Sequence, residues 1–214
     1  MIPGGFYLVV DGPDGCGKTT QGNLLADALD RDFDVLRVRE PGGTVIGDEI
    51  RAVLLDRRHK DMSSLTEVFL FSASRRETIE KIVAPALRDG KIVLSDRSYY
   101  STEAYQGAAG NVDLESLNKV NAMATEGVAH DLAFIFDIDS AVGLARAGIV
   151  SGGADRIEEK ALAYHEKVRA GYLRIAKRDS EVCVLVDASR EVSAIHEEVY
   201  RISKRRINRL LKDA

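Results

Sequence analysis

Residues 12–19 read GPDGCGKT, which matches the phosphate-loop pattern G-x-x-x-x-G-K-[ST]. An apolar run at residues 6–10 precedes the motif and a helical pattern follows it. Glycines let the backbone turn tightly, so that successive amide groups face a polyphosphate, and the helix adds the positive end of its dipole. A glycine-rich turn that matched the pattern by chance would not be expected to have both a strand before it and a helix after it. The motif therefore predicts binding of a nucleoside triphosphate.

The loop also supplies side chains suited to a triphosphate. The Lys18 ammonium group can reach the β- and γ-phosphates, and the Thr19 hydroxyl can ligate the Mg²⁺ that accompanies them. The predicted ATP-binding residues are Gly12, Pro13, Asp14, Gly15, Cys16, Gly17, Lys18, Thr19 and Thr20.

Short apolar runs separated by helical patterns predict the fold class. Because these runs are continuous rather than alternating, we expect strands covered on both faces, which is typical of a parallel sheet between helices. Ligands of such sheets collect at the carboxyl ends of the strands. We predict a three-layer α/β fold and a single domain over residues 1–214. The expected strands are residues 6–10, 35–38, 92–94, 132–136 and 182–186.

Composition narrows the partners. The chain has 34 acidic and 30 basic residues and a net charge of −4, which argues against a general nucleic-acid binder. Its two cysteines, Cys16 and Cys183, suggest neither a bridge nor a metal site. No cleavable signal or bilayer-length apolar stretch is evident, so we expect a soluble, cytoplasmic protein without a membrane partner. The basic run near residues 201–212 is interpreted as a solvated helix face.

A glycine-rich connector separates two predicted helices late in the chain. Residues 147–154 are small or apolar, and a long helix with an apolar stripe is expected from Asp155 onward. Such a connector suits a lid, at about residues 147–155, that closes over a triphosphate. An ordinary solvent-exposed loop is the alternative.

Further blocks resemble a known family. After the second expected strand comes REPGGT at residues 39–44, then FLFSASR at 69–75, DRS at 96–98, STEAYQG at 101–107 and DRIE at 155–158. Together with the phosphate loop, and in this order and spacing, they resemble thymidylate kinases over nearly the whole chain. The resemblance implies a nucleoside monophosphate kinase fold with a five-stranded parallel sheet, transfer of a phosphoryl group from ATP to dTMP with Mg²⁺, and a homodimer.

The same resemblance implies roles in holding dTMP. Phe71 would stack on thymine, Arg75 one helical turn later would bond a base carbonyl, and Tyr105 would press against the sugar where a ribose carries its 2′-hydroxyl. Asp14 would accept a bond from the 3′-hydroxyl. Taken singly, each of these residues could equally be a packing residue of the core or a surface charge without a role in binding. The implied substrate-binding residues are Asp14, Glu40, Arg51, Phe71, Arg75, Arg97, Thr102, Tyr105 and Gln106.

Catalysis, on this resemblance, is positioning plus electrostatic stabilisation. The implied catalytic residues are Lys18, Arg97, Arg146 and Arg156, and the implied metal ligands are Thr19 and Asp96. Because the attacking phosphate oxygen is already ionised, no general base is needed. Some members of the family carry an arginine in the phosphate loop, and others carry several basic residues in the lid. Here position 15 is a glycine and the lid region retains only Arg146 and Arg156, which resembles the bacterial type but with a sparse lid.

Two other functions fit the motifs. In a deoxynucleoside kinase, Glu40 would act as general base on a neutral 5′-hydroxyl. In a nucleotide-dependent switch, ATP would bind without phosphoryl transfer to a small molecule, and a partner-binding surface would replace the pocket of Phe71 and Arg75.

Overall fold

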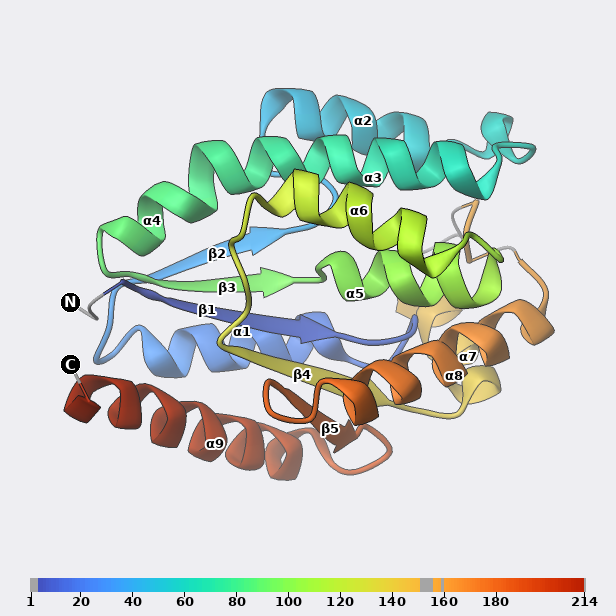
Figure 1. Cartoon of the computed structure of the whole chain (residues 1–214). Coiled ribbons are helices and arrows are strands. Elements are labelled where there is room, and N and C mark those ends of the chain that lie inside the picture. The colour runs from blue at the N-terminus through green and yellow to red at the C-terminus, as the bar shows by residue number, and fades with distance from the viewer. Residues whose placement is uncertain (1–3, 151–155, 159, 214) are drawn as a thin grey trace.

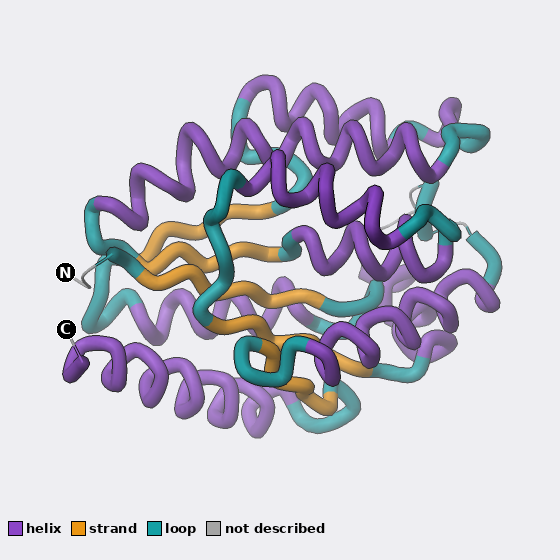
Figure 2. The backbone as a smooth tube through the Cα atoms, viewed as in Figure 1, coloured by secondary structure: helices purple, strands orange, loops and turns teal. Residues whose placement is uncertain are grey.

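Five parallel strands form one sheet at the centre of the protein (Figures 1 and 2). The computed structural model describes residues 4–150, 156–158 and 160–213. The strands lie in the order β2-β3-β1-β4-β5. Strands β2 and β3 lie on one side of β1, and β4 and β5 lie on the other, so the strand order reverses at β1. Their bounds are β1 Phe6–Asp11, β2 Val35–Arg39, β3 Ile92–Asp96, β4 Leu132–Asp137 and β5 Cys183–Asp187.

Helices cover both faces of this sheet. The helices are α1 Lys18–Leu29, α2 Val45–Leu55, η1 Arg57–His59, α3 Ser64–Thr78, η2 Ile79–Val83, α4 Ala84–Arg88, α5 Tyr99–Thr102, η3 Glu103–Ala109, α6 Leu114–Thr125, α7 Ser140–Val150, α8 Leu162–Arg178 and α9 Val192–Asp213. Among them, η2 and η3 are π-helical, and η3 continues α5 without a break.

The side chains of β1 show why the sheet needs two cores. Phe6, Leu8 and Val10 pack with α1 and α9, whereas Tyr7 and Val9 pack with η2, α4, α5, η3 and α8 on the opposite face. All of them are buried. The continuous apolar runs therefore mark strands that are covered on both sides, and the predicted three-layer α/β fold is confirmed.

The expected helix after the connector begins later than predicted. Helix α8 starts at Leu162 rather than at Asp155, because Ala161 is extended at its N-terminus and residues 156–158 form a turn. Ile157 is buried for a different reason than helical periodicity, since it packs in the core beside α8. Residues 147–150 of the predicted lid belong to α7, and residues 151–155 lie outside the described residues.

The C-terminal helix α9 exposes only part of the basic run. Ile195, Val199 and Ile207 face the core and Arg201 and Arg205 are exposed, whereas the half-buried Lys204 and Arg206 bond Asp32 and the Glu181 carbonyl oxygen. No helix in the described part of the chain has the length and apolar content of a membrane span.

The phosphate loop packs directly against α7. Gly12, Gly15 and Gly17 have φ values of 149°, 71° and 84°, a backbone region that other residues rarely adopt. A Cβ on Gly15 would lie 1.8 Å from the Gly143 carbonyl oxygen, and a Cβ on Gly143 would lie 2.5 Å from the Asp14 carbonyl oxygen. Loop and helix therefore touch backbone to backbone.

This contact makes a testable prediction about α7. The Gly143→Ala variant forces the loop and helix apart, so we expect it to lower the free energy of unfolding by about 1–3 kcal/mol and to weaken ATP binding. Gly148→Ala in the same helix is the matched control, because a Cβ there meets nothing within 4 Å. Thermal melts and ATP titrations of both variants check the expectation, and equal behaviour of the two would contradict it.

Candidate active site

A cleft of about 850 Å³ opens at the carboxyl ends of the strands. Both the phosphate loop and most predicted acceptor-side residues line it, which is where ligands bind in open parallel sheets. Gly12, Pro13, Arg75 and Arg156 are the predicted site residues that do not line it. Those that do are Asp14, Gly15, Cys16, Gly17, Lys18, Thr19, Thr20, Glu40, Arg51, Phe71, Asp96, Arg97, Thr102, Tyr105, Gln106 and Arg146.

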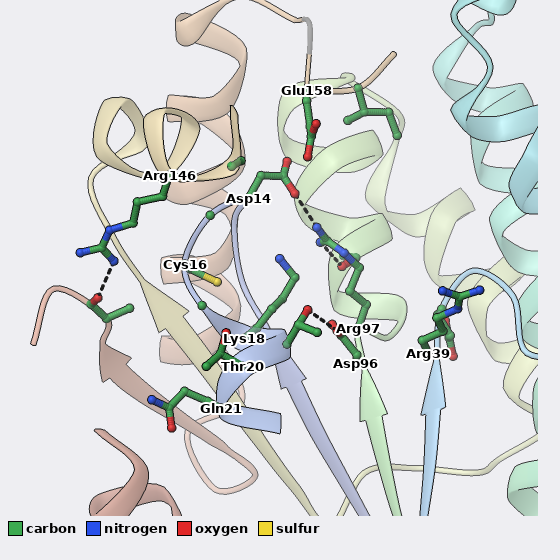
Figure 3. A pocket seen from close by; sticks show the side chains of 18 of the residues that line it. Asp14, Cys16, Lys18, Thr20, Gln21, Arg39, Asp96, Arg97, Arg146 and Glu158 are labelled. Atoms are coloured by element: carbon green, nitrogen blue, oxygen red, sulfur yellow. Dashed lines mark hydrogen bonds and ion pairs between the residues drawn. The ribbon is translucent and has the colours of Figure 1, made fainter. Parts of the chain in front are cut away.

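The phosphate loop and Lys18 form one compact unit. Gly17 is left-handed at the N-terminus of α1, so the chain turns from loop to helix there. The Lys18 Nζ atom donates to the Pro13 carbonyl oxygen at 3.1 Å, and the side chain is largely buried. Figure 3 shows this ammonium group inside the loop. An ammonium group and the first amides of a helix together form an anion site.

A hydroxyl and a carboxylate meet beside the loop. Thr19 Oγ1 donates to Asp96 Oδ2 at 2.5 Å, and Asp96 ends β3, the neighbour of β1 in the sheet. Oxygen atoms of this kind suit Mg²⁺, which takes few protein ligands and completes its shell with water and phosphate. Within the described residues, no group of three or more His, Cys, Asp or Glu side chains could hold a metal by itself.

Arg97 is clamped between the loop and η3. Its Nη2 atom donates to Asp14 Oδ1 at 2.5 Å, its Nη1 atom donates to Ser101 Oγ at 3.1 Å, and its guanidinium lies 5.4 Å from the Tyr105 ring centre. The Tyr105 hydroxyl donates to Asp14 Oδ2 at 2.7 Å. Arg97 has a φ of 76°, a strained conformation for a residue with a side chain.

This arrangement stabilises the charge of Asp14. Burial alone would raise the pKa of Asp14, but the positive charges of Arg97 and Lys18 outweigh burial, so its pKa is lowered. Burial and the neighbouring Asp14 charge raise the pKa of Tyr105 well above its ordinary value. Asp14 is therefore a carboxylate, and Tyr105 a neutral hydroxyl, at neutral pH.

Arg75 lies behind the cleft in a buried network. Its Nε atom donates to Glu40 Oε2 at 2.7 Å, its Nη1 atom to Asn121 Oδ1 at 2.9 Å and its Nη2 atom to Thr102 Oγ1 at 3.0 Å. Burial raises the pKa of Glu40, although Arg75 opposes this. Phe71, one turn before Arg75 on α3, is half-buried and lines the cleft in front of this network.

Arg51 provides a second guanidinium on the acceptor side. It extends from α2, and its Nη1 atom donates to the Pro41 carbonyl oxygen at 3.0 Å. Arg51 and Arg97 therefore reach one cleft from opposite elements, α2 and the loop after β3. Two guanidinium groups with fork-shaped donors suit a phosphate group.

Arg156 does not lie where the resemblance implied. Instead of facing the phosphate loop, its Nη1 atom donates to Glu67 Oε1 at 2.7 Å, and its Nε atom donates to the Leu54 carbonyl oxygen at 3.0 Å. Both partners of the ion pair are buried, with side chains about 1% exposed. A charge so deep in the protein needs a partner, and Glu67 on α3 provides one.

Glu67 is a residue that the sequence analysis missed. It also accepts from Gln106 Nε2 at 2.7 Å, so it joins Arg156 to a residue that lines the cleft. One signal was present in the sequence, because Glu67 stands four residues before Phe71 and eight before Arg75. Residues at this spacing share one face of a helix.

The donor side of the cleft contains the predicted Arg146, but the segment that it contacts after β5 was missed. Arg146 donates to the Ala188 carbonyl oxygen at 3.2 Å, and Gln21 donates to the Val192 carbonyl oxygen at 2.8 Å. Figure 3 shows Arg146 and Gln21 on the opposite side of the phosphate loop from Arg39. The loop between β5 and α9, at residues 188–191, and the start of α9 at Val192 therefore line the cleft. The loop's place after a strand was the only available signal.

Comparisons with known proteins agree with this geometry. The family described as "Thymidylate kinase" matches residues 10–199. A thymidylate kinase of Exiguobacterium sp. is 40% identical over 196 residues, covering 91% of this chain and 92% of the relative. One of Symbiobacterium thermophilum is 38% identical over 209 residues, covering 97% of each chain.

A solved structure extends the likeness to three dimensions. The crystal structure of thymidylate kinase from Ehrlichia chaffeensis superposes with a TM-score of 0.78 at 31% identity, covering 94% of this chain and 100% of that one. The fold is thus that of the nucleoside monophosphate kinases with a phosphate loop, as the resemblance implied. By sequence, fold and the content of its cleft, the chain belongs to the thymidylate kinase family.

Proposed function

We propose that this protein transfers the γ-phosphoryl group of ATP to dTMP and forms dTDP for dTTP synthesis. One observation carries the proposal: a single cleft joins the phosphate loop to an acceptor pocket with Phe71, Tyr105 and two arginines. Both nucleotides therefore fit in one space, with their phosphates between them. Membership of the thymidylate kinase family supports the same reaction.

The acceptor pocket matches the parts of dTMP. Phe71 offers a flat apolar face to a pyrimidine ring. Asp14 keeps acceptor capacity for a 3′-hydroxyl, because among the described residues its two oxygens accept one hydrogen bond each, from Arg97 and from Tyr105. Tyr105 is held in place by its bond to Asp14, and in this position its ring would clash with the 2′-hydroxyl of a ribose. Arg51 and Arg97 hold the phosphate.

Transfer then depends on charge. Two anionic phosphates repel each other in a shielded cleft, and the cations Lys18 and Arg97 offset this repulsion and stabilise the charge that develops during transfer. Arg146 lines the donor side of the same cleft. An ionised phosphate oxygen of dTMP attacks directly, so none of these residues has to remove a proton.

Mg²⁺ fits the pair of oxygen donors beside the loop. Thr19 and Asp96 would hold it, directly or through water, and the ion would screen the charge of the ATP phosphates. Their hydrogen bond of 2.5 Å keeps both oxygens together at the mouth of the phosphate loop.

Thymidine is not favoured as the acceptor. Glu40, which would have to serve as base for a neutral hydroxyl, is already bound by Arg75 in the buried network. The relatives are named for the phosphorylation of thymidylate, and the two arginines of the pocket would have no phosphate to hold if thymidine were bound.

A panel of acceptors tests the proposed reaction. The wild-type protein is incubated with ATP, Mg²⁺ and one of dTMP, dUMP, dGMP, UMP or thymidine, and the products are separated. We expect dTDP from dTMP as the main product, and no thymidine monophosphate from thymidine. Turnover of thymidine without turnover of dTMP would reverse the assignment, and ATP hydrolysis indifferent to every acceptor would indicate a switch.

Arg97 provides a second prediction. In Arg97→Lys the fork of donors is lost although the charge remains, so we expect kcat to fall by about a hundredfold or more. Arg178→Lys is the control, because Arg178 pairs with Glu103 and does not line the cleft. Steady-state kinetics with dTMP measure both variants. A kcat for Arg97→Lys close to that of the control would remove Arg97 from the mechanism.

We further propose that the protein acts as a homodimer in the cytoplasm. Its cysteines are free and buried, as in a reducing compartment. The neighbouring helices α2, α3 and α6 (Figure 1) expose large apolar side chains, which supports a covered interface. Val53 is 43%, Leu65 48%, Phe69 56% and Met123 79% exposed.

The dimer has its own test. Phe69→Glu places a charge on this apolar surface, so we expect it to shift the molar mass measured by light scattering from dimer to monomer. Leu211→Glu on α9 is the control, because that leucine is also exposed but lies across the sheet from α3. A wild-type protein that is monomeric at micromolar concentration would contradict the proposal.

A further inference from the structure

One face of α3 aims three side chains towards the acceptor side of the cleft. Glu67, Phe71 and Arg75 follow one another at intervals of four residues, so they lie on one side of the helix. Phe71 reaches the cleft, whereas Glu67 is 0% exposed and Arg75 2% exposed. The proposed mechanism uses Phe71 but gives no role to Glu67, a buried carboxylate whose charge is balanced by Arg156.

Glu67 divides its two oxygens between different partners. Oε1 accepts from Arg156 Nη1 at 2.7 Å and lies 3.5 Å from Lys160 Nζ, so it faces the positive charges of the segment that precedes α8. Oε2 accepts from Gln106 Nε2 at 2.7 Å. Glu67 therefore connects that segment to η3, the helix that carries Tyr105 and Gln106.

The bond to Glu67 determines which end of the Gln106 amide is available. An ionised carboxylate can only accept hydrogen bonds, whereas a primary amide has an NH₂ group at one end and a carbonyl oxygen at the other. Gln106 must therefore turn its NH₂ group towards Glu67. Because Gln106 also lines the cleft, its carbonyl oxygen is the group left to meet a ligand.

A fixed acceptor distinguishes between pyrimidines. Thymine and uracil carry an N–H group at ring position 3, and a carbonyl oxygen can accept from it. Cytosine has a bare nitrogen there, which would face the oxygen without a hydrogen between them. A site that leaves a polar group unpaired rejects that ligand strongly.

We propose that Glu67, held by Arg156, is a positioning residue that fixes the Gln106 carbonyl oxygen for bases with an N–H group at position 3. The inference rests on the proposed function, because it concerns the base of the acceptor nucleotide. Arg156 then contributes to choice of the base rather than to stabilisation of the transferred phosphoryl group. Without the carboxylate, the Gln106 amide can rotate and present its NH₂ group to cytosine.

Glu67→Gln tests the inference, since a neutral amide can accept or donate and no longer fixes Gln106. We expect KM for dTMP to rise about tenfold and the ratio of kcat/KM for dTMP to that for dCMP to fall about tenfold or more. KM for ATP should stay unchanged. Glu103→Gln is the matched control, because it also removes the charge of a buried carboxylate paired with an arginine, Arg178 at 2.8 Å, but Arg178 does not line the cleft as Gln106 does.

A second variant separates specificity from folding. Glu67→Gln leaves Arg156 buried without a charged partner, whereas replacing Glu67 and Arg156 together by Met removes the whole pair, which proteins often tolerate. The double variant should show the same loss of discrimination, with thermal melts to verify folding. An unchanged dTMP-to-dCMP ratio in either folded variant overturns the inference. Failure of the wild-type protein to phosphorylate dTMP would instead refute the proposed function.

Discussion

The geometry of the site depends on one carboxylate at the end of β1. Asp11 is fully buried and accepts hydrogen bonds from the Ser98 amide at 3.0 Å, the Ser101 hydroxyl at 2.7 Å and the Tyr172 hydroxyl at 2.7 Å. These donors come from the start of α5, from α5 itself and from α8. A buried group bonded in this way is hard to replace, because its loss leaves several donors unpaired. Asp11 thus joins the phosphate loop, the segment after Arg97 and helix α8 through hydrogen bonds.

Ion pairs within the protein orient the charges of the site. Arg97 pairs with Asp14, and Arg75 with Glu40, so each guanidinium is oriented by a carboxylate. The left-handed backbone of Arg97 adds strain that the surrounding contacts must maintain, as is common at functional sites. Oriented groups need little rearrangement when the phosphates meet, and this lowers the barrier to transfer.

Local signals in the sequence predicted the strands and the phosphate loop. All five strands came from apolar runs, and the phosphate loop came from its own motif, because both depend on neighbouring residues. The position of Arg156 could not be predicted in this way, because its partner Glu67 is 89 positions away and the two meet only through tertiary packing. Helical periodicity also placed the start of α8 too early, at Asp155. The π-helical turns of η3, which set the direction of Gln106, leave no simple periodic pattern.

The phosphate loop contains a thiol, and its surroundings make that thiol inert. Burial raises the pKa of Cys16, although the nearby Lys18 opposes the effect, and the side chain packs in the core cluster that includes Phe136 and Ile138. The thiolate, which is the form attacked by oxidants and alkylating agents, is therefore scarce at neutral pH. Oxidation or alkylation of Cys16 should consequently be slow, although this thiol lies in the phosphate loop itself.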